Sequence, residues 1–226
     1  MQQKKSLAQK VNIMRAAVMG ANDGILSVAG IVIGVAGANA SSYGVFISGI
    51  AGMLAGTVSM AMGEYVSVNT QKDAQKRAVI EQKSALSLDY QGEFNYVKKR
   101  YLEQGIKEEL AEKATREMME HAPLVTTVRE HYGFNPQEFT SPYAAAFASM
   151  ISFPLGSILP LVGILVFSPA TRIAATFLAV ILALTITGYG AAVLGGADPK
   201  HGILRNVLSG MLTMVVTYAI GTLIGR

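Results

Sequence analysis

Five long apolar stretches predict five membrane-spanning helices. Each holds about twenty or more nearly uncharged residues, which at about 1.5 Å per residue suffice to cross a hydrocarbon core roughly 30 Å thick. The predicted spans cover residues 16–37, 44–68, 143–167, 172–194 and 206–225. Pro154 and Pro160 fall inside the third span and are expected to interrupt and kink it. The pattern therefore predicts an all-α, polytopic membrane protein.

The chain divides into three parts on this pattern. Residues 1–69 hold a basic helix at the membrane surface, predicted for residues 1–15, followed by spans one and two. Residues 70–140 are rich in charge and predict a small helical insert outside the bilayer. Residues 141–226 hold spans three to five.

The insert is expected to contain several short helices. Span two should continue as a water-exposed helix until the pattern breaks at residues 87–92. Further helices are predicted at 93–104 and 107–121, the second stopped by Pro123, with a short piece around 124–132.

Charge distribution predicts the orientation in the membrane. With the N-terminus inside, all but two of the 19 Lys and Arg residues fall in inner segments, the exceptions being Arg172 and Arg226. The N-terminus and the insert are therefore expected to be cytoplasmic. The net charge of +4 does not indicate nucleic-acid binding, because basic residues alternate with acidic ones. The chain has no cysteine, which excludes disulfides, thiolate metal sites and thiol nucleophiles.

Two carboxylates and a thioether inside the first two spans suggest a cation site. Asp23 lies eight residues after Arg15, and Glu64 lies eight residues before Lys72, so both acids are expected about 12 Å beyond a basic anchor. Met60 is one turn deeper than Glu64 on the same face. An ionisable side chain within a span usually marks an ion path. Sulfur beside carboxylate favours a transition metal over Mg²⁺ or Ca²⁺.

Each of these residues also has a structural interpretation. Asp23 would then be a helix-start or kink residue hydrogen-bonded to Asn22, and Glu64 an acid that reaches the headgroups. Met60 would be ordinary apolar packing.

A second set of candidate ligands lies in the insert. Glu117, Glu120 and His121 share a helix face at i, i+3 and i+4 and could bind a divalent ion. The alternative is a solvated helix whose acids pair with Lys113 and Arg116. The stripe of Leu110, Ala114 and Met118 predicts that Met118 is core and that Met119 is the freer sulfur.

Four stretches resemble the vacuolar iron transporter family, including its bacterial and nodulin-like members. They are GANDGILSVAGIVIGVAGA, AGTVSMAMGEYVSVNTQKDAQKRA, SFPLGSILPL and the glycine-rich last span. The resemblance implies a five-span homodimer that moves Fe²⁺, and often Mn²⁺, out of the cytosol in exchange for protons. Asp23 and Met60 match family residues on a path at the dimer interface, and Glu64 stands in the GEY motif of the bacterial type.

The same resemblance implies that the cytoplasmic helices gather metal through glutamates and methionines. Glu81 and Met119 join the insert candidates on this basis. The chain departs from the plant-type pattern at Gly52, where those transporters have a glutamate, and its insert is poorer in glutamate.

The leading hypothesis is a proton-coupled exporter of Fe²⁺ or Mn²⁺, with Co²⁺ and Zn²⁺ not distinguished by the donor set. On this hypothesis we expect no tightly bound cofactor. The expected partners are the lipid bilayer, divalent metal ions, protons and a second copy of the chain. The alternative is a non-transporting, membrane-anchored metal sensor or partner-binding protein. An enzyme is disfavoured, since no Glu-x-x-His pair lies within a span. Without a targeting extension, a prokaryotic plasma membrane is expected, or an organelle membrane in a eukaryote.

Overall fold

The chain forms two compact units built from helices. The computed structural model describes residues 7–138 and 140–225, in which every regular element is helical. The membrane unit comprises Leu7–Val66 and Ser141–Arg226, and the insert unit comprises Ser67–Thr140. Lys4, Lys5 and Arg226, which the orientation argument counted, lie outside the described residues.

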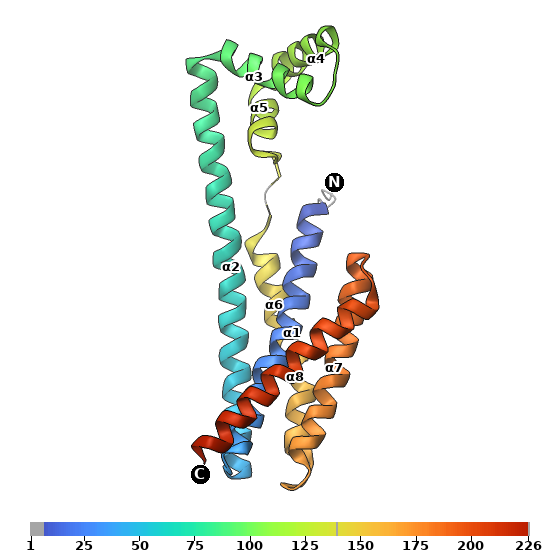
Figure 1. Ribbon diagram of the computed structural model, residues 1–226. Helices are drawn as coiled ribbons and strands as arrows, with labels where there is room; N and C mark the ends of the chain where they lie inside the picture. The colour runs from blue at the N-terminus through green and yellow to red at the C-terminus, as the bar shows by residue number, and fades with distance from the viewer. Residues whose placement is uncertain (1–6, 139, 226) are drawn as a thin grey trace, which may run out of the picture. The chain divides into compact units, whose positions relative to one another are not determined.

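Five helices of the described chain are long and apolar enough to cross a membrane, as the sequence predicted. They are α1 (Leu7–Gly37), α2 (Ser42–Leu88), α6 (Pro142–Val166), α7 (Arg172–Gly195) and α8 (Pro199–Ile224). Within the membrane unit, α1 packs against α6, α7 and α8, and α8 crosses α1 and α7 obliquely (Figure 1). Because α1 contacts three neighbouring helices, the helix face that carries Asp23 is held in a fixed position.

Three element boundaries differ from the prediction. Residues 7–15 are not a separate surface helix, because α1 begins at Leu7 and continues past residue 16 without a break. Helix α6 runs unbroken through both of its prolines, which neighbouring helices allow within a membrane bundle. Helix α8 begins at Pro199 rather than at residue 206. The Asp198 carboxylate accepts a hydrogen bond from the Lys200 backbone N–H at 2.9 Å, and Pro199 suits the first helical turn.

Two apolar cores hold α1 on opposite sides. On one side, Ile25 and Ile33 pack with side chains of α7 and α8. On the other, Val28 and Val32 pack with side chains of α2 and α6. Helices α1 and α6 approach closely at Gly24, where an added β-carbon would collide with the backbone carbonyl of Phe153. This contact needs glycine, because only a residue without a side chain lets the two backbones meet.

The insert unit contains the later part of α2 together with α3 (Tyr90–Glu103), α4 (Glu108–His121) and α5 (Pro123–Tyr132). Helix α2 does continue beyond its apolar part, as predicted, and ends at Leu88. Asp89 then caps α3 by accepting a hydrogen bond from the Gly92 N–H at 2.8 Å. Pro123, expected only to stop a helix, opens α5.

The predicted core stripe of α4 is wrong by one residue. Leu110 is 61% exposed, whereas Ala111, Thr115 and Met119 are buried, Met119 with only 1% exposure. Ala111 and Met119 pack in one core with Phe94, Val97 and Tyr101 of α3, and this contact outweighs the larger apolar surface of Leu110. Met118, not Met119, is consequently the more accessible sulfur.

Candidate metal site

A pocket of about 610 Å³ in the membrane unit brings Asp23 of α1 together with Met60 of α2. Ser27, one turn after Asp23, donates a hydrogen bond from its hydroxyl to Asp23 Oδ1 at 2.6 Å. This bond orients the carboxylate and uses one of its two oxygens. The remaining lining residues are small or apolar: Ile31, Gly52, Ala55, Gly56, Ser59, Gly63 and Phe153.

The donors in this pocket suit a transition metal but do not complete a coordination shell. One carboxylate, one thioether and two serine hydroxyls form a mixed hard and soft set, which favours first-row transition metals over Mg²⁺. Within residues 7–138 and 140–225, no three His, Asp or Glu side chains gather where they could hold a metal ion. A metal in this pocket would therefore need ligands from water or from another chain.

Glu64 does not line this pocket. Its carboxylate is only 5% exposed and forms an ion pair with Arg15 of α1, at 2.9 Å between Oε2 and Nη2. Arg15 also donates hydrogen bonds to Asn12 Oδ1 and Met19 Sδ, both at 3.1 Å. The structure thus brings Asp23 and Met60 together and holds Glu64 apart with a basic partner.

The helix register explains this separation. An added β-carbon on Gly52 would lie against Ile31, and one on Gly49 would lie against Val32, so α1 and α2 run antiparallel with these residues opposed. Continued toward Asp23, the register places Met60 opposite it and Glu64 one turn farther along α2, about 6 Å away. The equal depth expected for the two acids does not hold. Arg15, taken as a headgroup anchor, instead reaches the Glu64 carboxylate.

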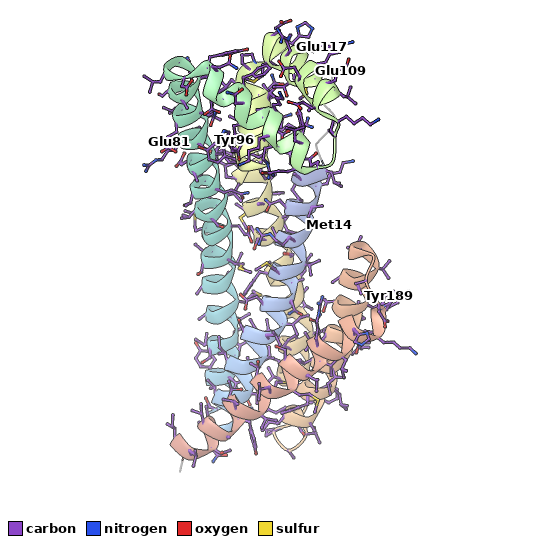
Figure 2. All side chains as sticks on the ribbon, turned by 45° about the horizontal axis from the view of Figure 1, so that its top comes forward. Met14, Glu81, Tyr96, Glu109, Glu117 and Tyr189 are labelled. Atoms are coloured by element: carbon purple, nitrogen blue, oxygen red, sulfur yellow. The ribbon has the colours of Figure 1, made fainter. Side chains whose placement is uncertain are left out.

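The insert candidates are only partly gathered. Glu117 and His121 line a pocket of about 360 Å³, together with Met118. Figure 2 shows Glu117 on α4 and Glu81 on α2, both projecting from their helices. Glu81 forms an ion pair with Arg77 at 2.8 Å.

Two further insert candidates are not in that pocket. Glu120 is exposed and is not among its lining residues, and the buried sulfur of Met119 faces the core. Arg116, expected to pair with these candidate acids, contacts Glu112 instead, at 2.9 Å.

Sequence reasoning missed a half-buried polar cluster that joins the helices of the insert unit. Gln82 donates a hydrogen bond to Glu93 Oε2 at 2.5 Å, and His131 Nε2 lies 2.8 Å from the same oxygen. The His131 ring stacks on Tyr96, with ring centroids 3.8 Å apart. These residues come from α2, α3 and α5, so no spacing along the chain reveals the cluster.

A second group lies beside this cluster. The Tyr101 hydroxyl donates to Glu130 Oε1 at 3.3 Å and lies 3.3 Å from Met118 Sδ. Burial, reinforced by the Glu130 carboxylate, raises the pKa of Tyr101. The hydroxyl therefore keeps its proton and can donate to Glu130 over the physiological pH range.

The sequence pattern of the VIT family matches residues 14–222. The chain belongs to the VIT family. The "Vacuolar iron transporter homolog 1" of Oryza sativa subsp. japonica is 35% identical over 213 residues, covering 94% of this chain and 74% of the relative. The "Vacuolar iron transporter" of Acanthamoeba castellanii is 32% identical over 220 residues, covering 97% and 81%. The "Vacuolar iron transporter homolog 2.1" of Arabidopsis thaliana is 29% identical over 221 residues, covering 96% and 84%.

Membership of the VIT family confirms the resemblance drawn from the sequence motifs. The relatives are named as transporters, which places the chain in a non-enzyme family, and their names support metal transport. Together with the five apolar helices, they indicate an integral membrane protein. Gly52, where plant-type members have a glutamate, lines the Asp23 pocket, so a glutamate there would add a carboxylate to this same site.

The Arg15–Glu64 pair predicts an asymmetric response to mutation in this VIT-family chain. Arg15→Gln should destabilise the fold by about 3 to 5 kcal/mol, because it leaves a buried carboxylate without its partner. Glu64→Gln should cost only about 1 kcal/mol, since Arg15 is 44% exposed and can be hydrated. Thermal unfolding followed by circular dichroism measures both. Arg205→Gln, at an exposed position of α8, is the control, and equal losses for Arg15→Gln and Glu64→Gln would contradict the burial argument.

Proposed function

We propose that this VIT-family protein exports Fe²⁺ or Mn²⁺ from the cytosol in exchange for protons, through the pocket of Asp23 and Met60. The observation that carries the proposal is the pairing of a carboxylate with a thioether in one pocket of an apolar helical unit. A carboxylate attracts the divalent ion, and the sulfur favours a transition metal over Mg²⁺. The donor set does not separate these ions from Co²⁺ or Zn²⁺.

Proton exchange follows from the chemistry of Asp23. Its carboxylate can hold a proton or take part in binding a metal, and each occupant disfavours the other. Ser27 orients this carboxylate, because its hydroxyl donates to Oδ1. Metal entering from one side thus releases a proton, and a proton from the other side releases the metal. Glu64 joins this path only when its ion pair with Arg15 opens.

A homodimer would complete the site. Ala51, Ala55, Ser59 and Gly63 recur every fourth residue along α2, and all four are exposed in this single chain. Such a stripe of small residues suits close approach of another helix within a membrane. Ala55, Ser59 and Gly63 also line the Asp23 pocket, so a second copy packed here would bring its own Asp23 and Met60 beside it.

The dimer can be tested by cysteine cross-linking, because the chain contains no cysteine. In Ala55→Cys, oxidation in the membrane should convert most of the protein into a disulfide-linked dimer. Leu178→Cys, on an exposed position of α7, is the matched control and should remain monomeric on a non-reducing gel. Cross-linking of Leu178→Cys but not of Ala55→Cys would place the interface elsewhere.

The remaining parts of the proposal concern the insert and the location. The distribution of Lys and Arg supports an insert that faces the cytosol. There Glu117, Met118 and His121 would gather metal at their pocket.

The relatives named vacuolar support an organelle membrane if the source is eukaryotic, and a prokaryotic source would place the protein in the plasma membrane.

Flux into proteoliposomes tests the function directly. With an acidic interior, external Mn²⁺ or Fe²⁺ should enter and the interior pH should rise as protons leave. Without the pH gradient, metal uptake should fall severalfold. Metal uptake with no proton movement would rule out exchange. Absence of any flux would leave the membrane-anchored sensor as the better hypothesis.

A further inference from the structure

Arg172, the first residue of α7, is a buried cation without a carboxylate partner among the described residues. It is 7% exposed. One terminal nitrogen donates to Ser42 Oγ at 3.3 Å and the other to the Ala40 carbonyl at 3.3 Å. Its Nε is buried and has no hydrogen-bond partner within residues 7–138 and 140–225. A guanidinium removed from water and paired only with neutral oxygens is costly, so a counter-ion is expected.

The membrane unit has no acidic side chain left to supply that counter-ion. Its sequence contains three acids. Asp23 accepts from Ser27 in the metal pocket, Glu64 pairs with Arg15, and Asp198 caps α8 and contacts His201 at 2.8 Å. The negative charge that balances Arg172 must therefore come from outside these three side chains.

Arg172 lines a pocket of about 350 Å³ formed by two turns of the membrane unit. One turn joins α1 to α2 and contributes Asn39, Ser41 and Ser42, and the other precedes α7 and contributes Pro169. Both α2 and α7 start at this pocket, and Ser41 already accepts from the Gly44 N–H at 3.1 Å. Two long helices thus direct their positive N-terminal ends toward the space that holds the unpaired guanidinium.

We propose that this pocket binds a phosphate group, with Arg172 as its principal ligand. The planar guanidinium matches the oxygens of a phosphate, and the helix N-termini and serine hydroxyls supply further donors. Such a group has two possible sources. The turn residues join apolar spans, so the pocket lies at the level where a phospholipid headgroup carries its phosphate, and the same donors would accept free inorganic phosphate from the aqueous side.

Thermal unfolding in a maltoside detergent separates the two sources. The 226-residue chain, stripped of lipid and free of phosphate buffer, is titrated with sodium phosphate against sodium chloride of equal ionic strength. In parallel it is titrated with short-chain phosphatidylglycerol against a diacylglycerol of the same chain length. The phosphate-bearing partner should raise Tm by roughly 5 °C or more at about 100-fold excess over Kd. Inorganic phosphate alone would identify a soluble anion, and phosphatidylglycerol alone a lipid headgroup.

Variants assign the effect to Arg172. Arg172→Gln should weaken the binding at least about tenfold, while Arg205→Gln, at an exposed arginine of the same unit, should bind as the unmodified chain does. Arg172→Lys keeps the positive charge but lacks the planar guanidinium, so it should bind with intermediate affinity. This variant tests the site even if Arg172→Gln does not fold.

Two results would overturn the proposal. The first is an unmodified chain that neither phosphate source stabilises beyond its control, and the second is an equal shift in Arg172→Gln.

Discussion

Asp23→Asn is expected to lower metal flux at least about 100-fold while leaving the helices folded. The substitution keeps the size of the side chain and its hydrogen bond with Ser27, but removes the charge that attracts the ion and the site that exchanges a proton. Loss of even an outer-shell partner of a metal typically costs 10- to 100-fold in affinity, so loss of a direct ligand should cost at least as much. Uptake of Mn²⁺ into acid-loaded proteoliposomes measures the effect.

Asp198→Asn is the matched control for this experiment. It removes a carboxylate from the same unit, but Asn caps a helix about as well as Asp, so flux and fold should both persist. Circular dichroism and the Ala55→Cys cross-link check that Asp23→Asn still folds and assembles. Undiminished, metal-driven proton release by Asp23→Asn would remove this residue from the path.

Gly24→Ala is expected to destabilise the membrane unit by about 2 to 3 kcal/mol. The new methyl group would collide with the Phe153 carbonyl, a backbone atom that cannot rotate away, and would push α1 from α6. It would also disturb the hydrogen bond that the Ser157 hydroxyl donates to the Gly24 carbonyl at 3.2 Å. The midpoint of thermal or denaturant unfolding measures the loss.

Gly190→Ala is the same substitution at another position, and it is expected to have the opposite effect on stability. Gly190 lies inside α7 of the same unit, and an added β-carbon there meets nothing within 4 Å. Alanine favours the helix over glycine by up to about 1 kcal/mol, so this variant should be slightly more stable than the unmodified chain. Similar losses at both positions would show that the close contact of α1 with α6 does not limit stability.

The sequence predicts the architecture well because the length of each apolar stretch can be read from contiguous residues. Five apolar stretches give five long helices, and the continuation of α2 beyond its apolar part was also visible. The boundary of α8 was missed because hydropathy does not register the cap that Asp198 supplies to Lys200. The buried face of α4 was predicted wrongly. The small Ala111 is buried because it packs against α3, and only the folded unit shows this contact.

The candidate site could be predicted in part for the same reason. Asp23 and Met60 stand out as polar or sulfur-bearing groups on apolar helices, and the structure places them in one pocket. The partner of Glu64 was not predictable, since Arg15 lies 49 positions away and the pairing depends on the register between two helices. Arg172 gave no signal beyond its position at the start of a span. Its burial, and the lack of an acidic partner among the described residues, become visible only in the folded unit, where two turns meet.

The two walls of the Asp23 pocket differ in how readily they accept a larger side chain. The α1 wall is confined by apolar cores on both sides, whereas on α2 an added β-carbon at Gly56 would strike the Phe153 ring and one at Gly63 would meet nothing within 4 Å. Within one chain, Gly63 is therefore a place where a single codon change can introduce a further oxygen donor without repacking that chain, and in the proposed dimer this donor would face the second copy. If the pocket binds metal as proposed, evolution or a protein engineer can adjust the number of ligands, and with it the choice among ions, at this one position.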